Sequence, residues 1–198
     1  LSLQGGAIGV LLLTVYAAFR LYGILPAGAA FALSVVLVAG MGLLAVLQDA
    51  KALAVFALLA GFLAPIWLST GSGNHVALFS YYAVLNAAIV AIAWFRSWRV
   101  LNLLGFVFTF GIGALWAGSG YRAEHYASTQ PFLLLFFVFY LLVPILFARR
   151  QPEGRRDLID GCLVFGTPLV AFSMQAGLLD SILPDGARMP LALCAVGL

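Results

Sequence analysis

Residues 25–47 read LPAGAAFALSVVLVAGMGLLAVL, an apolar run without a charged side chain. Such a run is long enough to cross a bilayer as an α-helix, which needs about 20 apolar residues. Similar runs recur along the chain, which has 198 residues, is 64% hydrophobic and only 9% charged. Because soluble domains are roughly 25% charged, this composition excludes a water-soluble globular protein and leaves no room for a soluble catalytic domain.

The few charges and the Gly, Pro and Asn clusters divide the chain into helix-length apolar segments. The runs lack the alternation of outer-membrane barrels, and lipid-facing backbone must then be satisfied within helices. The sequence therefore predicts an all-α polytopic transmembrane helix bundle with about seven complete spans and a truncated eighth. The spans are expected at about 3–19, 25–47, 52–68, 76–95, 100–117, 132–148, 158–179 and from Pro190 onward.

The connection before the sixth span is the one sizeable predicted loop, at residues 118–130. Pro131 follows it and is expected in the first turn of the sixth span, where proline is tolerated. We treat residues 1–198 as one transmembrane domain. Since apolar runs reach both ends of the chain, we expect it to be a fragment of a larger multipass protein.

Lys and Arg are distributed unevenly between the two sides of the predicted membrane. Cytoplasmic loops carry an excess of these residues, so the richer side is expected inside. The start of the first span is then cytoplasmic, and loops 69–75, 118–130 and 180–189 lie outside. The richer side holds Lys51, Arg96, Arg99, Arg149, Arg150, Arg155 and Arg156, and the poorer side holds Arg20, Arg122 and Arg188.

Polar side chains at membrane depth are costly and face the bundle interior or a wet cavity. Asn86 lies midway along the fourth span, with Tyr81 and Tyr82 one turn before it, and Asn102 lies in the fifth span. Tyr82 and Asn86 share one helical face because they are four residues apart. These residues either hydrogen-bond neighbouring helices or contact a ligand, and we predict all four as candidate ligand-binding residues.

The loop at 118–130 places Arg122, Glu124 and His125 close together in sequence. Arg forms forked contacts with phosphate or carboxylate groups, and His titrates near neutral pH. The three residues are therefore further candidates for ligand binding, with a solvated loop holding a local Arg122–Glu124 pair as the alternative. His75 is expected at the start of the fourth span.

Known catalytic and cofactor motifs are missing from the sequence. It contains no Walker loop, no G-x-S-x-G and no H-E-x-x-H, so no catalytic residue, metal ligand or cofactor is predicted. Cys162 and Cys194 have neither metal-site nor disulfide-framework spacing, and their redox state is left open. Mid-span acidic residues are also missing, which disfavours a carrier driven by protons or sodium.

Small residues recur at four-residue spacing, which lets helices approach closely. The pairs are Gly5/Gly9, Gly28/Ala32, Ala57/Gly61 and Ala114/Gly118. Composition alone accounts for part of this pattern, because the chain has 21 glycines.

Three stretches of the sequence carry a resemblance to a known family: LAGFLAP at 59–65, SGNHVALFSYYAVLN at 72–86, and WRVLNLLGF at 98–106 followed by TFG at 109–111. They resemble the bacterial predicted membrane protein family known as domain of unknown function 2339. The resemblance implies a long multipass protein of the bacterial inner membrane, so that the outside loops would be periplasmic. It implies no activity, substrate or catalytic residue.

Three functional hypotheses fit these observations. The first is a non-enzymatic module that binds or translocates an envelope solute or lipid-linked molecule. The second is a membrane scaffold that docks another membrane protein or the missing parts of its own chain, and the third is an intramembrane transferase with His125 as base. Membrane lipids are expected partners in each case, and nucleic acid is not, because positive-inside bias accounts for the net charge of +3.

Overall fold

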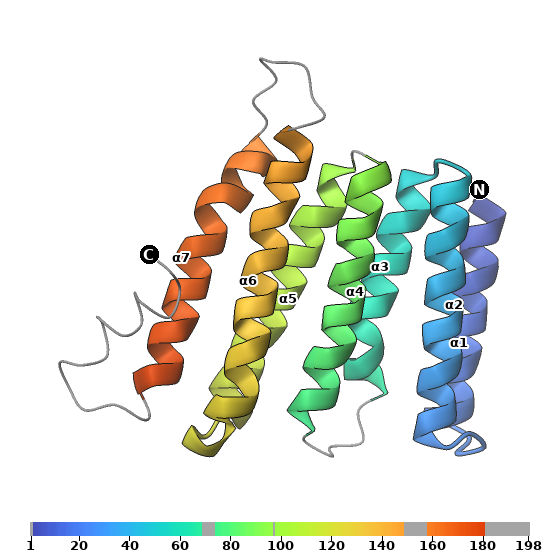
Figure 1. The fold of residues 1–198 in the computed structure, drawn as a ribbon. Coiled ribbons are helices and arrows are strands. Elements are labelled where there is room, and N and C mark those ends of the chain that lie inside the picture. The colour runs from blue at the N-terminus through green and yellow to red at the C-terminus, as the bar shows by residue number, and fades with distance from the viewer. Residues whose placement is uncertain (1, 69–73, 97, 149–157, 181–198) are drawn as a thin grey trace. The chain divides into compact units, whose positions relative to one another are not determined.

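The computed structural model describes residues 2–68, 74–96, 98–148 and 158–180, and their regular structure is entirely helical (Figure 1). The predicted all-α fold is therefore confirmed. The predicted eighth span, from Pro190 onward, lies outside the described residues. The elements are α1 (Ser2–Arg20), α2 (Ala27–Leu47), α3 (Lys51–Trp67), α4 (His75–Phe95), α5 (Arg99–Gly120), the 3-10 helix η1 (Ala123–His125), α6 (Tyr126–Ala148) and α7 (Leu158–Asp180).

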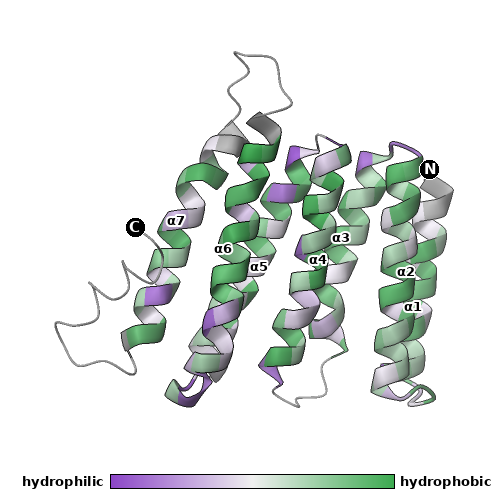
Figure 2. Cartoon of the chain, in the orientation of Figure 1, coloured by the Kyte–Doolittle hydropathy of each residue, from purple (hydrophilic) through white to green (hydrophobic). Residues whose placement is uncertain are grey.

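Five of the described helical segments are long and apolar enough to cross a membrane, as judged by length and composition. Two shorter apolar helices, Gly5–Arg20 and Lys51–Trp67, accompany them. Figure 2 shows apolar residues along the helices and hydrophilic residues gathered largely at helix ends. The five segments are Ala27–Leu47, His75–Phe95, Arg99–Gly120, Ala123–Leu146 and Gly161–Leu179.

The chain forms two compact units, Leu1–Asn74 and His75–Leu198, called unit 1 and unit 2 below. In unit 1, α2 packs against both α1 and α3. The buried residues of α2 recur every three or four positions, which places them on one helical face. They are Ala30, Ser34, Val38, Met41 and Ala45.

The turn between α2 and α3 begins where the backbone leaves the helix at Asp49. This residue has φ of 51°, in the left-handed region that Asp tolerates better than most residues. The Ala50 amide then donates to the Ala45 carbonyl at 2.8 Å, which satisfies a carbonyl at the end of α2.

Unit 2 is built around α6, which packs against α4, α5 and α7. The start of α4, the connection from α5 to α6 and the end of α7 lie together at one end of unit 2, called the η1 end below (Figure 1). Two hydrogen bonds hold this end: the Tyr121 hydroxyl donates to the Leu178 carbonyl at 3.0 Å, and His75 bonds Ser128.

The predicted loop at 118–130 is largely helical, which corrects the sequence-based expectation. Helix α5 continues to Gly120 and α6 already begins at Tyr126, so the connection is short and includes η1. Pro131 therefore lies inside α6 rather than in its first turn. The stretch Tyr-Ala-Ser-Thr-Gln contains no glycine or proline that would stop a helix, and its polarity alone suggested a loop.

The small-residue pairs predicted from the sequence differ in how closely they pack in the structure. Ala57 and Gly61 are both buried on α3. A Cβ atom added at Gly5 would lie 3.5 Å from Leu53 Cδ1, whereas Cβ atoms at Gly9, Gly28 and Gly118 would meet nothing within 4 Å. Close helix packing at these last three glycines is therefore not seen within the described residues.

Candidate functional site

Asn86 is the centre of a polar network inside unit 2. Its residue is only 1% exposed, and its Nδ2 donates to the Tyr82 carbonyl at 2.8 Å and to Thr109 Oγ1 at 2.9 Å. The Tyr140 hydroxyl donates to Asn86 Oδ1, and the Thr109 hydroxyl lies 3.2 Å from the same oxygen. Asn86, Thr109 and Tyr140, called the Asn86 network below, join α4, α5 and α6.

Gly105 provides the space for this network. A Cβ atom at this position would lie 2.6 Å from the Tyr140 hydroxyl oxygen and 2.5 Å from Ile89 Cδ1. Both distances are shorter than ordinary van der Waals contact, so only glycine fits without moving its neighbours.

The predicted face of Tyr82 and Asn86 is a buried face of α4, since each residue is 1% exposed. The Asn86 amide is fully hydrogen-bonded to protein groups, which is the interhelical interpretation of the two that the sequence left open. Tyr81 is half-buried on another side of α4. Asn102 is 1% exposed and lies outside the network, and its Nδ2 has no partner among the described residues. A ligand role for these four residues stays a prediction.

Sequence reasoning missed Tyr140. The signal that points to it is simple: Tyr140 carries the single hydroxyl group within the apolar run at 132–148. A lone polar group at membrane depth requires a partner, and Asn86 of the fourth span was already a candidate for one.

Two imidazole rings and an indole meet at the η1 end of unit 2. The centroids of the His75 and His125 rings are 4.6 Å apart, and His75 stacks on Trp116 with centroids 5.0 Å apart and an interplanar angle of 29°. These residues come from α4, η1 and α5. Together with Ser128 of α6 they are called the His75–His125 cluster below.

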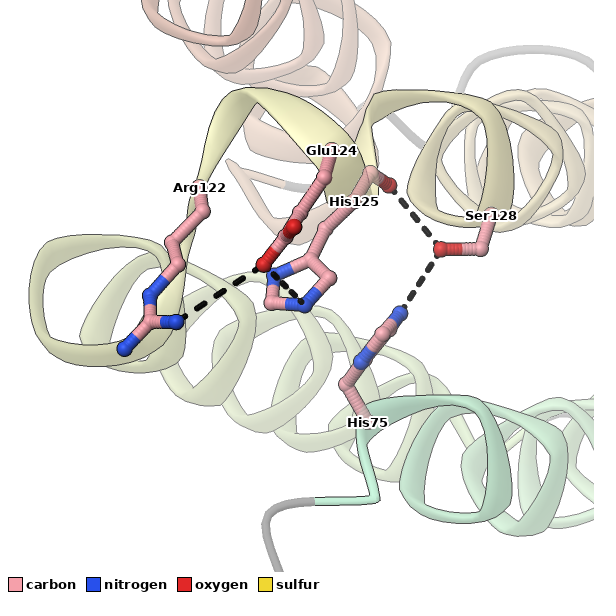
Figure 3. A network of polar contacts seen from close by, with 5 residues as sticks. All are labelled: His75, Arg122, Glu124, His125 and Ser128. Atoms are coloured by element: carbon pink, nitrogen blue, oxygen red, sulfur yellow. Dashed lines mark hydrogen bonds and ion pairs between the residues drawn. The ribbon is translucent and has the colours of Figure 1, made fainter.

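Ser128 contacts both histidines of the cluster (Figure 3). The Ser128 hydroxyl donates its one hydrogen to the His125 carbonyl at 3.0 Å. Its oxygen can then only accept from His75 Nε2, which lies 2.7 Å away. The hydrogen is therefore assigned to Nε2 of His75.

Arg122 and Glu124 lie beside this cluster, as Figure 3 shows. Arg122 Nη1 is 3.7 Å from Glu124 Oε1, and the two side chains are 78% and 67% exposed. The same carboxylate oxygen is 3.8 Å from His125 Nε2, while His125 Nδ1 is buried without a partner among the described residues. Exposed ion pairs are weak, so breaking the Arg122–Glu124 pair costs little free energy.

The structure thus brings Arg122, Glu124 and His125 together, and it adds His75. Sequence reasoning placed His75 at the start of the fourth span but did not include it among the site residues. The alternation of the spans across the membrane points to His75, because it places the start of the fourth span and the predicted loop at 118–130 on the same side of the membrane. Among the described residues, no three His, Cys, Asp or Glu side chains form a group that would hold a metal ion.

Comparison with known proteins gives one family match. The model of the family described as predicted membrane protein (DUF2339) matches residues 1–198. The chain belongs to this family. The DUF2339 match agrees with the resemblance found in the sequence, and the protein is a membrane protein with several candidate spans. No curated protein and no solved structure matches it.

Proposed function

We propose that this DUF2339 protein is a non-enzymatic module of the bacterial inner membrane that binds an envelope solute or the headgroup of a lipid-linked molecule at the periplasmic η1 end of unit 2. The observation that carries the proposal is the approach of His75 and His125, two imidazoles from different helices whose ring centroids are 4.6 Å apart, beside exposed Arg122 and Glu124.

The chemistry of these groups favours a ligand with an anionic or strongly hydrogen-bonding part. Guanidinium donors fit phosphate or carboxylate oxygens, and imidazole both donates and accepts. The Asn86 network has a different role in this proposal. Its polar groups are satisfied within the protein, and it holds α4, α5 and α6 in the arrangement that presents the η1 end.

The distribution of Lys and Arg supports a periplasmic position for this end. The connection that carries Arg122 belongs to the side with three such residues, and the opposite side has seven. Short loops rich in Lys and Arg stay in the cytoplasm.

Native mass spectrometry of the protein extracted from its own membrane tests the proposal. We expect wild type to retain a small molecule or lipid that is lost from the double variant Arg122→Ala/His125→Ala. Arg20→Ala is the matched control, because Arg20 is an exposed arginine of unit 1, and this variant should retain the molecule. Equal retention by the double variant contradicts the proposal.

A scaffold is the second candidate function, and the open glycines favour it. A Cβ atom added at Gly9 of α1 or at Gly28 of α2 would meet nothing within 4 Å. This leaves room for a helix of a partner protein to approach closely. Gly9→Leu/Gly28→Leu should then abolish capture of a partner membrane protein while leaving thermal stability unchanged. Retained complex formation by this variant counts against the scaffold.

A further inference from the structure

Both histidines of the η1 end lie where a long helix begins. His75 is the first residue of α4, and His125 directly precedes Tyr126, the first residue of α6. The N-terminus of a helix carries partial positive charge, so it favours an anion and disfavours a cation. The two rings, with centroids 4.6 Å apart, would also repel each other if both were protonated. Without a bound anion, this geometry therefore favours neutral imidazoles.

The charged side chains beside the histidine pair balance each other. Within the described part of the chain they are Arg122 and Glu124, which carry opposite charges and form an exposed pair. The contacts from the neighbouring helices, Ser128 of α6 and the stacked Trp116 of α5, carry no charge. Each proton added to the pair therefore gives this end one positive charge in excess, which an anionic ligand would neutralise.

Glu124 Oε1 marks a position where an anion can bind. This oxygen is 3.7 Å from Arg122 Nη1 and 3.8 Å from His125 Nε2. The Glu124 side chain is 67% exposed, and moving it away from Arg122 costs little. A ligand oxygen in the same place would have a guanidinium and an imidazolium as donors, the combination that gives strong hydrogen bonds.

We infer that the η1 end binds a phosphate-like oxyanion of its ligand together with a proton, which the His75–His125 pair takes up. The inference rests on the proposed function and adds a ligand class and a regulation to it. The hydrogen of neutral His75 is on Nε2, toward Ser128, so an added proton on this ring binds Nδ1. Because the bound anion stabilises the protonated pair, the anion binds more tightly as the pH falls through the range in which histidine titrates.

Trp116 reports the protonation of the pair. Its indole stacks on His75 with centroids 5.0 Å apart and is 6.0 Å from the His125 ring, and a protonated imidazole quenches indole emission. For this measurement, phenylalanine replaces the other three tryptophans, Trp67, Trp94 and Trp98.

The experiment is a pH titration of Trp116 emission, with and without sulfate, in phosphatidylcholine nanodiscs at constant ionic strength. Sulfate is the probe because its charge is constant across the range in which histidine titrates, around pH 6.5. We expect saturating sulfate to raise the midpoint by about 0.7 pH units, which corresponds to about fivefold tighter binding by the protonated pair. In a second arm, phosphatidylglycerol replaces part of the phosphatidylcholine and no sulfate is added.

The two arms distinguish the sources of the oxyanion. A shift with sulfate assigns a soluble anion, and a shift with phosphatidylglycerol alone assigns a lipid headgroup. Arg122→Gln should abolish either shift, because Arg122 is one of the two donors at the position of Glu124 Oε1. A midpoint that neither arm moves, a shift that survives Arg122→Gln, or emission that does not titrate at all overturns the inference.

Substitutions of the other groups test the assignment to the pair. His75→Gln and His125→Gln each retain a side-chain donor and remove one titrating ring, so each should remove most of the sulfate shift. Glu124→Gln removes the competing carboxylate, and sulfate should then act at a several-fold lower concentration. Arg20→Gln, at an exposed position of unit 1, is the control and should behave as wild type. A full sulfate shift in both histidine variants overturns the inference.

Native mass spectrometry of the same proteins separates this inference from the proposed function. A ligand that is retained by wild type and lost from Arg122→Ala/His125→Ala, together with an unmoved midpoint, overturns the proton coupling alone. A sulfate shift in a protein that retains no molecule from its membrane supports the oxyanion site and contradicts the proposed function.

Discussion

At the scale of single residues, the interior of unit 2 depends on how each polar group within it is satisfied. Asn86 uses both hydrogens of its amide, one on a carbonyl of its own helix and one on Thr109. Interhelical hydrogen bonds in membranes contribute about 0.6 kcal/mol on average. The network therefore specifies which helix faces meet, and the close packing around Gly105 contributes more to stability.

This balance predicts the relative cost of two substitutions. Gly105→Ala should lower the free energy of unfolding by about 1–3 kcal/mol, since overpacking displaces Ile89 and Tyr140. Tyr140→Phe should lower it by only about 0.6 kcal/mol, because Asn86 Oδ1 keeps the Thr109 hydroxyl at 3.2 Å. Unfolding in mixed detergent micelles measures both.

Gly111→Ala is the control for the glycine substitution. It lies on the same helix, and its added Cβ would meet nothing within 4 Å, so its stability should match wild type. A larger loss for Tyr140→Phe than for Gly105→Ala would contradict the account of this network.

Residue patterns predicted part of this interior. Asn86 was identified because an amide at mid-span is rare, but its pairing with Thr109 of the next span was not predicted. Tyr140 was missed since tyrosine counts as apolar in a hydrophobic run, and its pairing depends on which face of α6 meets α4. Gly105 was one of 21 glycines, and only packing distinguishes it from an open position such as Gly111.

At the scale of helices, the η1 end holds α4 and α6 together through His75 and Ser128, whose Nε2 and Oγ atoms are 2.7 Å apart. Ser128 also donates to the carbonyl of His125. Ser128 thus links the start of α4 to the connection before α6. This link brings the His75 and His125 rings next to each other.

A double-mutant cycle tests the contact between α4 and α6. The losses of stability in His75→Ala and Ser128→Ala should be non-additive by about 0.5 kcal/mol or more, as residues in direct contact are. The control cycle combines His75→Ala with Ser119→Ala, because Ser119 donates to the Leu115 carbonyl of its own helix. That pair should be additive, and additivity of His75 with Ser128 would contradict the contact.

Helix boundaries were predicted well where charges or turn residues mark them, as at Phe95 and Arg99. They were predicted poorly at 118–130, since the signal there was polarity and helix α6 begins five residues before Pro131. Polar residues end a membrane span without ending its helix, so hydropathy located the span and left the helix end undetermined.

At the scale of the whole molecule, the chain is a multipass membrane protein. Its membership of the DUF2339 family and its succession of apolar helices both indicate this. Hydropathy predicted that much because a bilayer requires long apolar helices. The candidate site was only partly accessible from sequence. Arg122, Glu124 and His125 are close together in the chain, but His75 belongs to α4 and meets His125 only when the helices pack.

Orientation is a prediction at this scale. With Cys162 and Cys194 replaced by serine, an impermeant maleimide should label Ala123→Cys from the periplasm, because η1 lies on the side that is poor in Lys and Arg. Lys51→Cys, at the start of α3 on the richer side, should react only after the inner membrane is opened. The reverse pattern would contradict the proposed orientation.

The most direct test of the account is photo-crosslinking from the η1 end in native membranes. Benzoylphenylalanine replaces Ala123, which is exposed in η1, or Phe95, which is 74% exposed at the opposite end of α4. The account predicts one small-molecule or lipid adduct that forms at position 123, is absent at position 95, and disappears when Arg122→Ala/His125→Ala is added. Adducts that are the same at both positions, or that survive the double substitution, would contradict a binding site at the η1 end.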